Sequence, residues 1–368
     1  MLLLVFGTLA GLGIAEVFVR SALDIYECDE QLGWSYSPGM TGVKVSRSGE
    51  FANVVRFNEL GFRDEEHALE KDDDTYRILL LGDSFVGGLQ VPIEAAFPTL
   101  LEQQLNRGGE AGDRVEVINA GVDGYGTAQQ LLLFKERLHR YQPDLTILSV
   151  FLYTDLSDNF YEAGHQNHHL ARKCGRPYFV RGEAGLQPYT VEQDEQLAPR
   201  RPLDGLLGWS VLYSALVPPP PLAPAFHQRE LFRTEYSESQ LESWALTQQL
   251  MLALAAEVER HGSEFAVLNV PHGIQVGQSF PNLAPTYFQQ EQLENSLNMM
   301  NHFLHAHDVP AIDLVPAMQR AIAGGELLYY EDDGHWNRDG HRVVADVLLG
   351  WLRERCPAIG LDHPSCLP

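Results

Sequence analysis

A serine and a histidine near opposite ends of the chain could act together as a nucleophile and a general base. Ser84 stands in LLLGDSFVGG, residues 79–88, where an apolar run gives way to glycine and polar residues. His335 stands in YYEDDGHWN, residues 329–337. A serine hydroxyl becomes a good nucleophile when a base within hydrogen-bond reach takes its proton. The two residues therefore predict acyl-transfer chemistry, provided that the fold brings them together.

The base needs a partner that fixes its tautomer, and two neighbouring aspartates could supply it. Asp332 lies three residues before His335, and we assign it this role, with Asp333 as the competing candidate. His341 is a weaker competitor for the base, because it falls inside a predicted helix and is expected to be structural. Taken alone, Ser84 could equally be a helix N-cap, and His335 a capping or surface residue.

The elements expected around these residues alternate between strand and helix. Short apolar runs predict buried parallel strands, and the stretches between them predict helices. The order favours an α/β domain of three layers (α/β/α) with a central, mostly parallel sheet, whose ligand site lies at the carboxyl ends of the strands. The expected strands are 76–82, 114–121, 144–153, 264–270 and 310–314, and the expected helices are 94–106, 127–140, 238–261, 287–307 and 339–354.

An insertion interrupts this alternation, and further segments flank the domain. Residues 160–236 contain several histidines and the run PPPPLAP, so we expect a functional or disordered insertion over the sheet. We expect a connector and lead-in at 22–75, the main domain at 76–355 and a C-terminal tail at 356–368.

Residues 1–21 predict a membrane anchor. The first fifteen residues carry no charge, and the apolar run reaches the roughly 17 to 20 residues of a spanning helix if Glu16 lies near the interface. A cleaved signal peptide and a buried helix are the alternatives, and the first of these lacks a typical small-residue cleavage site.

Composition excludes several classes of function. The chain has 26 basic and 50 acidic residues, and a net charge of −24 disfavours binding to nucleic acid. No metal site is expected, because the four cysteines form no CxxC pair and the histidines at 165, 168 and 169 have no clearly spaced carboxylate. Cys356 and Cys366 could close a C-terminal loop in an oxidising compartment, or all four thiols could be free.

The segments around Ser84 and His335 together resemble the SGNH (GDSL-type) hydrolase superfamily. Its first block is GDS after a buried strand, matched by residues 82–84, and its last block is DxxH, matched by Asp332 and His335. A glycine after the second strand is matched by Gly121 in NAGVDGYGT. The resemblance covers roughly residues 53–355, and FNELGFRDEE (57–66) looks like the lead-in of membrane-anchored bacterial members.

This resemblance implies a flavodoxin-like fold and a Ser84–His335–Asp332 triad. It also implies an oxyanion hole built from the Ser84 N–H, the Gly121 N–H and an asparagine side chain. The third block departs from the family's GND, because this chain has YTDLSDN at 153–159. The alignment places Thr154 where the asparagine belongs, and we assign its hydroxyl as the third donor. Alternatively, Asn159 swings in or the third donor is missing.

The resemblance further implies a serine esterase that needs no cofactor. The expected substrate is a small acyl ester, such as an acetyl group on an envelope or extracellular glycan. With the predicted anchor, the domain is expected on the extracytoplasmic side of a membrane. Two alternatives remain open: transfer of the acyl group to a sugar hydroxyl by the same triad, and a catalytically silent glycan-binding or assembly protein.

Overall fold

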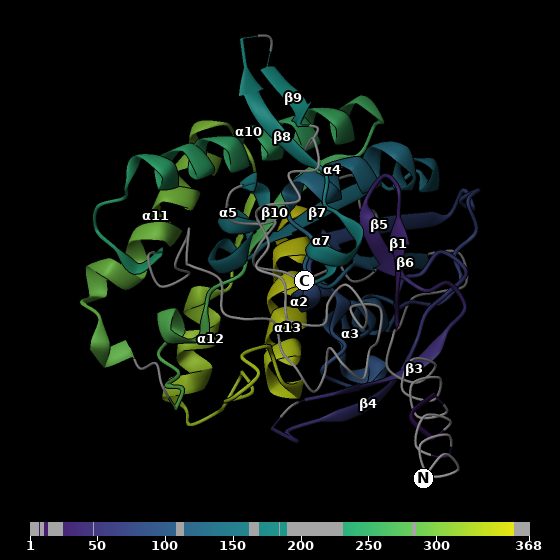
Figure 1. Cartoon of the computed structure of the whole chain (residues 1–368), viewed down its shortest axis with the longest axis horizontal. Coiled ribbons are helices and arrows are strands. Elements are labelled where there is room, and N and C mark those ends of the chain that lie inside the picture. Colours follow the sequence, from purple (N-terminus) through teal and green to yellow (C-terminus); the bar gives the residue numbers. More distant parts are fainter. Residues whose placement is uncertain are drawn as a thin grey trace.

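The computed structural model describes most of the main domain and its lead-in. Its described residues are 25–46, 48–107, 114–161, 169–183, 185–189, 231–281 and 285–356, together with Gly7 and residues 11–13. Within these ranges a parallel sheet lies between two layers of helices (Figure 1).

The sheet has five parallel strands in the order β11-β10-β7-β5-β6. In chain order this arrangement is 2-1-3-4-5, the flavodoxin-like order, in which ligands bind at the carboxyl ends of the strands. The predicted α/β/α architecture is therefore confirmed. The strands are β5 (Thr75–Gly82), β6 (Arg114–Gly121), β7 (Leu145–Val150), β10 (Glu264–Asn269) and β11 (Ala311–Asp313).

Helices cover both faces of the sheet, because alternate side chains of each strand point to opposite faces. Ile78 and Leu80 of β5 belong to the core on one face, while Leu79 and Leu81 belong to the core on the other. All four are almost fully buried, which explains the continuous apolar run in the sequence. One layer contains α3 (Phe97–Leu105), α12 (Val315–Ala323) and α13 (Arg338–Arg355), and the other contains α4 (Thr127–Glu136), α10 (Glu238–Arg260) and α11 (Gln290–Ala306) (Figure 1).

Two antiparallel hairpins precede the sheet. The first joins β1 (Tyr26–Asp29) to β2 (Gly33–Tyr36), and the second joins β3 (Thr41–Val45) to β4 (Ala52–Arg56). Trp34, Tyr36 and Val55 are fully buried in the same core as Leu79 and Leu81. This part of the segment that we predicted as a connector is therefore packed into the domain.

A disulfide links the first hairpin to a helix that follows β7 in the chain. Cys28 of β1 is bonded to Cys174 at the end of α7 (His169–Cys174), and 146 residues separate the two cysteines. Cys356 is also disulfide-bonded. Cys366, its expected partner, lies outside the described residues.

Some boundaries differ from the predicted ones. The strand expected to reach residue 153 ends at Val150, and α5 (Leu152–Asn159) begins almost at once. A hydrogen bond from the N-cap residue back to the first turn accompanies this start, because Asp155 Oδ2 accepts the Phe151 N–H at 2.6 Å. The helix expected at 94–106 is divided into a 3₁₀ turn, η1 (Ile93–Ala95), and α3. Helix α12 was not predicted.

The predicted insertion at 160–236 is described only in part. Besides α7, it contains the hairpin of β8 (Tyr178–Gly182) and β9 (Gly185–Tyr189), while residues 190–230 lie outside the description. The expected anchor at 1–21 also lies outside it, apart from Gly7 and residues 11–13. Among the residues that are described, no helix combines the length and apolar character needed to span a bilayer.

Candidate active site

Ser84 lies at the carboxyl end of β5, as the first residue of the short helix α2 (Ser84–Gly87). Asp83 caps this helix, because its carboxylate accepts a hydrogen bond from the Phe85 N–H at 2.9 Å. Close packing around the turn requires glycine: a Cβ on Gly82 would lie 2.3 Å from Val86 Cγ2, and one on Gly121 would lie 2.3 Å from the Gly87 nitrogen. The glycines thus let α2 rest directly on the sheet and present Ser84 at its edge.

Ser84 and His335 meet in the structure although 251 residues separate them. The Ser84 Oγ lies 2.6 Å from His335 Nε2, a short hydrogen bond. On the other side of the ring, His335 Nδ1 lies 2.6 Å from Asp333 Oδ1. This geometry corrects our assignment of Asp332, because the carboxylate paired with His335 belongs to Asp333.

The turn before α13 explains why Asp333 is the partner. Gly334 has a φ of +83°, and its N–H donates to the Tyr330 carbonyl at 3.0 Å. The Tyr330 N–H in turn donates to the His335 carbonyl at 2.8 Å. In this turn the side chains of Asp333 and His335, which are two residues apart, meet, while Asp332 is exposed to solvent. A spacing of three residues would suit a helix, and this segment is not helical.

The charges around His335 favour its protonated form, so its pKa is higher than that of a free imidazole. Burial alone would lower the pKa of His335, but the hydrogen bond and negative charge of Asp333 outweigh it and raise this pKa above its ordinary value. Burial tends to raise the pKa of Asp333, and the His335 contact outweighs this and lowers it. Burial also raises the pKa of the neighbouring Asp83 to about 7. The Asp333–His335 pair can therefore stabilise the imidazolium that forms when a serine proton is taken.

A pocket of about 390 Å³ opens beside Ser84 at the carboxyl ends of the strands. A volume of this size suits a small-molecule ligand. Its lining comes from the hairpins, from the loops after β5, β6, β7 and β10, and from the turn before α13. The lining residues are Tyr26, Lys44, Asp83, Ser84, Phe85, Gln90, Asp123, Gly124, Phe151, Tyr153, Thr154, Ser157, Asp158, His272, Asp333, Gly334 and His335.

Of the two glycines Gly121 and Gly124, only Gly124 lines this pocket. Gly121 packs behind α2, and its N–H donates to Asn119 Oδ1 at 3.1 Å. Our assignment of Gly121 as an oxyanion donor is therefore corrected, because this N–H already has an acceptor and the residue does not line the pocket. Within the described ranges, the N–H groups of Ser84 and Gly124 donate to no protein acceptor. The second glycine of GVDGYG was the available signal in the sequence.

Thr154 lines the pocket, whereas Asn159 does not. Asn159 is fully buried, and its amide donates to Thr127 Oγ1 at 3.2 Å and to Thr247 Oγ1 at 3.1 Å. Its Oδ1 accepts the Ala128 N–H at 3.1 Å. These contacts occupy the side chain, so the alternative in which Asn159 swings in is not compatible with the structure. Among the described residues, the Thr154 hydroxyl makes one long contact of 3.4 Å, to the Phe151 carbonyl.

The N-terminal hairpins contribute a charged group that the sequence analysis did not consider. Lys44 Nζ lies 2.8 Å from Asp123 Oδ2, and the hydroxyls of Tyr26 and Tyr36 donate to the same carboxylate at 2.6 and 2.7 Å. Burial would raise the pKa of Asp123, but Lys44 and the two hydroxyls outweigh it and lower this pKa. Lys44 and Tyr26 line the pocket, so its wall depends on residues far from the GDS block.

An aromatic corner with a neutral imidazole forms another wall of the pocket. His272 precedes η4 (Gly273–Val276), and its ring centre lies 4.5 Å from that of Tyr153 and 6.3 Å from that of Phe151. Burial lowers the pKa of His272 to about 4. Its Nδ1 accepts the Ile274 N–H at 3.3 Å, which leaves the proton on Nε2. The corner thus combines apolar rings with one neutral hydrogen-bond donor.

His341 has the structural role that we expected. It is buried, and its Nδ1 accepts the Phe97 N–H at 3.2 Å. Burial lowers its pKa to about 3.

No group of three or more His, Cys, Asp or Glu side chains arranged for a metal ion occurs within the described ranges. The histidines at positions 165 and 168 lie outside those ranges.

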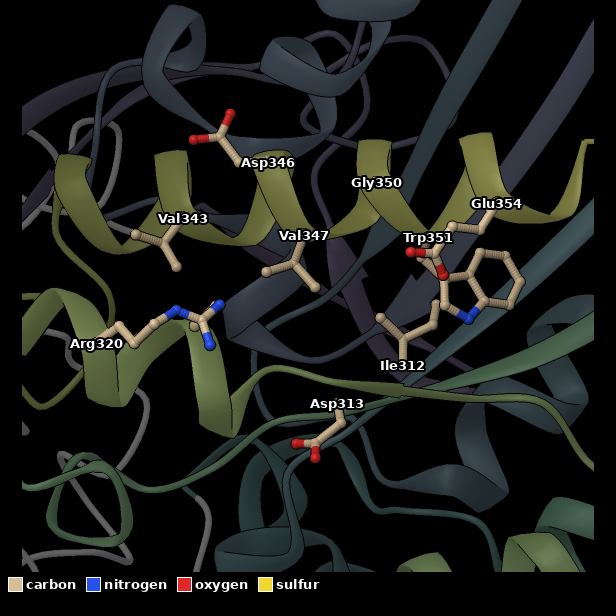
Figure 2. A pocket seen from close by; sticks show the side chains of 10 residues that line it. Ile312, Asp313, Arg320, Val343, Asp346, Val347, Gly350, Trp351 and Glu354 are labelled. Atoms are coloured by element: carbon tan, nitrogen blue, oxygen red, sulfur yellow. The ribbon is translucent and has the colours of Figure 1, made fainter. Parts of the chain in front are cut away.

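A larger hollow of about 480 Å³ lies between α12, α13 and the edge strand β11 (Figure 2). Charged side chains such as Asp313, Arg320 and Glu354 stand around it. Its ten lining residues include no serine, cysteine or histidine. Of these two pockets, the one beside Ser84 therefore contains a paired nucleophile and base, and the hollow beside α13 does not.

Comparison with known families and proteins gives two sequence matches. A family model described as an SGNH hydrolase-like domain of the acetyltransferase AlgX matches residues 227–364, which include His335. An arylesterase from Vibrio mimicus is 36% identical over 74 residues, which cover 20% of this chain and 36% of the arylesterase. The match thus spans about a third of the length of that relative.

Solved structures of esterases are also similar to this chain at low identity. An acetyl xylan esterase is 14% identical, with a TM-score of 0.42, and the comparison covers 75% of this chain and 99% of that one. An acetylxylan esterase from Geobacillus stearothermophilus is 9% identical, with a TM-score of 0.41, and covers 75% and 93%. The family model matches the part of the chain that contains His335, and the GDS block after β5 and the order of the sheet agree with its description as SGNH hydrolase-like.

Proposed function

We propose that this protein is a serine esterase that hydrolyses small acyl esters, with Ser84 as nucleophile, His335 as general base and Asp333 as the residue that orients the base. The observation that carries the proposal is the pair of 2.6 Å contacts from Ser84 Oγ to His335 Nε2 and from His335 Nδ1 to Asp333. These are the contacts that an activated serine requires.

In the proposed mechanism, the Ser84 oxygen attacks the ester carbonyl as its proton passes to His335 Nε2. Asp333 holds the proton on Nδ1 and stabilises the imidazolium. When the carbonyl re-forms, the C–O bond to the alcohol breaks and the alcohol takes the proton from Nε2. Water then attacks the acyl-serine through the same base, releases the carboxylic acid and restores Ser84.

The negative charge on the carbonyl oxygen needs donors that are already in place. The Ser84 and Gly124 N–H groups are the proposed backbone donors, and the Thr154 hydroxyl is the proposed third donor. Support comes from the position of all three residues in the pocket lining. A single donor of this kind typically contributes about 3–4 kcal/mol to transition-state stabilisation.

The proposed substrate is a neutral acyl ester, and an acetylated glycan is the form that we favour. The pocket lining contains four aspartates and one lysine, so it disfavours an anionic ligand. The rings of Phe151 and Tyr153 offer a face on which a sugar could stack, and the neutral His272 could donate to a hydroxyl. The names of the similar acetyl xylan esterases agree with this substrate class.

A second candidate is an acyltransferase that uses the same three residues. It is favoured by the family model, whose description names an acetyltransferase. The difference lies in the last step, where a sugar hydroxyl and not water attacks the acyl-serine. Adding a glycan acceptor to a reaction with an acetyl donor and analysing the products by mass spectrometry separates transfer from hydrolysis.

We further propose that the domain works in an oxidising, extracytoplasmic compartment and that residues 1–21 anchor it to the membrane. The Cys28–Cys174 disulfide supports the first part, because such bonds persist mainly outside the reducing cytosol. Fractionation of cells that express the whole chain, before and after a carbonate wash, tests the second part. A washed membrane pellet without the protein would contradict it.

The function is tested by labelling the whole chain with a fluorophosphonate probe, which reacts with activated serines. We expect an adduct on the peptide that contains Ser84, none in Ser84→Ala, and much slower labelling in His335→Ala. Peptide mass spectrometry identifies the modified residue. A folded protein that takes up no probe would contradict both the esterase and the transferase, and would favour a silent glycan-binding protein.

A further inference from the structure

The turn that carries Asp333 and His335 is held partly by hydrogen bonds to another segment of the chain. Within the turn, Tyr330 and Gly334 make the backbone hydrogen bonds described above. The N–H groups of Asp332 and Asp333, by contrast, find their acceptors on the second hairpin. The position of the Asp333 carboxylate therefore depends on a contact made by the lead-in of the chain.

That contact is made by both oxygens of Glu50, which lies just before β4. Glu50 Oε1 accepts the Asp332 N–H at 3.2 Å, and Oε2 accepts the Asp333 N–H at 3.0 Å. The carboxylate is itself held, because Ser48 Oγ donates to Oε2 at 2.9 Å. The Glu50 N–H donates to Ser46 Oγ at 2.7 Å. A two-point contact from a fixed carboxylate restrains both the position and the tilt of a backbone segment.

Neighbouring contacts tie the same hairpin to both sides of the site. The Phe51 and Tyr330 rings lie 5.1 Å apart, and the Tyr330 hydroxyl donates to the Gln90 carbonyl at 3.2 Å. Asn53 donates to the Leu89 carbonyl at 3.2 Å, in the loop that follows the Ser84 helix. The hairpin thus contacts the segment that carries the nucleophile and the turn that carries the base.

We propose that Glu50 is a positioning residue, which fixes the backbone of Asp332 and Asp333 so that the Asp333 carboxylate stays on His335 Nδ1. The proposal rests on the function proposed above and deepens it. Glu50 does not line the pocket, so it would act through Asp333 and not on the substrate.

Other charged groups also face the pair and must be kept constant in the test. Asp83 and Asp123 both raise the pKa of His335, after Asp333 itself. Lys44 faces Asp333, and the charge of His335 contributes to lowering the pKa of His341. None of these is changed by a substitution at Glu50. Because Glu50→Ala and Glu50→Gln remove the same charge, a difference in the His335 pKa between these two variants reports the Asp333–His335 contact and not the lost charge of Glu50.

The experiment compares Glu50→Ala and Glu50→Gln with Glu66→Ala as the matched control. Glu66 belongs to the same lead-in and makes the same kind of contact, since its carboxylate accepts the Glu59 N–H at 2.7 Å. It contacts neither the turn nor the pocket. For each whole-chain protein, the His335 pKa is measured by NMR, assigned with a His335→Gln variant, together with kcat, KM and Tm.

We expect Glu50→Ala to lower the His335 pKa toward the ordinary imidazole value and to lower kcat about 10- to 100-fold, with KM nearly unchanged. Glu50→Gln, which keeps one acceptor oxygen, should lie between Glu50→Ala and the wild type. If Glu50→Ala does not fold, Glu50→Gln is compared with the wild type instead. Glu66→Ala should match the wild type in the His335 pKa and in kcat.

An unchanged His335 pKa in a folded Glu50 variant would overturn the proposal, as would equal losses of kcat and Tm in Glu50→Ala and Glu66→Ala. The NMR measurement needs no substrate. If the wild type hydrolyses no ester and takes up no fluorophosphonate, but the pKa still falls in Glu50→Ala, the esterase function fails while the positioning role of Glu50 stands.

Discussion

The adjacent residues Asp332 and Asp333 both carry carboxylates, but the conformation of the turn brings only the Asp333 carboxylate to His335. Asp333 contacts His335, whereas Asp332 is exposed and contacts Glu50 only through its backbone. We therefore expect Asp333→Asn to lower kcat/KM about 10³- to 10⁴-fold, because an amide in this place favours the wrong imidazole tautomer. Asp332→Asn is the matched control and should change kcat/KM less than about threefold. Ester hydrolysis by the two purified variants decides between the aspartates, and equal losses would contradict the assignment.

The same residues predict how activity depends on pH. His335 must be neutral to accept the serine proton, and Asp333 raises its pKa above the ordinary 6.5. Because the raised pKa belongs to a base, activity should rise as the pH rises through that value and fall below it. A profile of kcat/KM between about pH 5 and 9 should therefore have its acid limb above the ordinary imidazole value. An acid limb at or below that value would mean that the Asp333 contact does not form in solution.

At the scale of elements, the strands were predictable because apolar residues dominate the central ones, as in TYRILLLG (β5) and LTILSV (β7), and such runs are buried by a sheet that is covered on both faces. The turn before α13 was not predictable, because the left-handed Gly334 decides which aspartate meets His335 and the spacing DDGH does not reveal it. Gly121 was misassigned for a similar reason, since two glycines of GVDGYG fit the pattern and only packing against α2 separates them. The sequence analysis did not place the hairpins at the site, because the residues that they contact there lie far away in the sequence and no local pattern indicates such contacts.

The disulfide is the element-scale feature with the largest expected effect on stability. Cys28–Cys174 closes a loop of 146 residues between β1 and α7. Closing a long loop stabilises the folded state by restricting the unfolded one, by about 2–5 kcal/mol. We expect the Cys28→Ser, Cys174→Ser double variant to lose that much free energy of unfolding in urea titrations. Wild-type protein treated with reductant should lose at least as much, because reductant also opens the disulfide of Cys356. Identical curves for the untreated wild type, the reduced wild type and the double variant would contradict the role of the Cys28–Cys174 disulfide.

At the scale of the whole molecule, the net charge of −24 acts on any charged substrate that approaches. An anionic ester is repelled at low salt, and the repulsion is screened as the Debye length falls from about 30 Å at 0.01 M to about 8 Å at 0.15 M. We expect kcat/KM for 4-acetoxybenzoate to rise over this range, while that for neutral phenyl acetate stays constant. Parallel salt dependence of both substrates would contradict the electrostatic argument.

Ser84 and His335 are 251 positions apart in the sequence, and this separation delays the assembly of the site during synthesis. A chain that grows at about 5–20 residues per second exposes the serine roughly 12 to 50 s before the histidine has been added. Until α13 docks and brings its preceding turn to the sheet, the hydroxyl has no base beside it. Nascent chains that lack His335 should therefore be unreactive at Ser84, so that reactivity is acquired only after the ribosome has added His335 and α13.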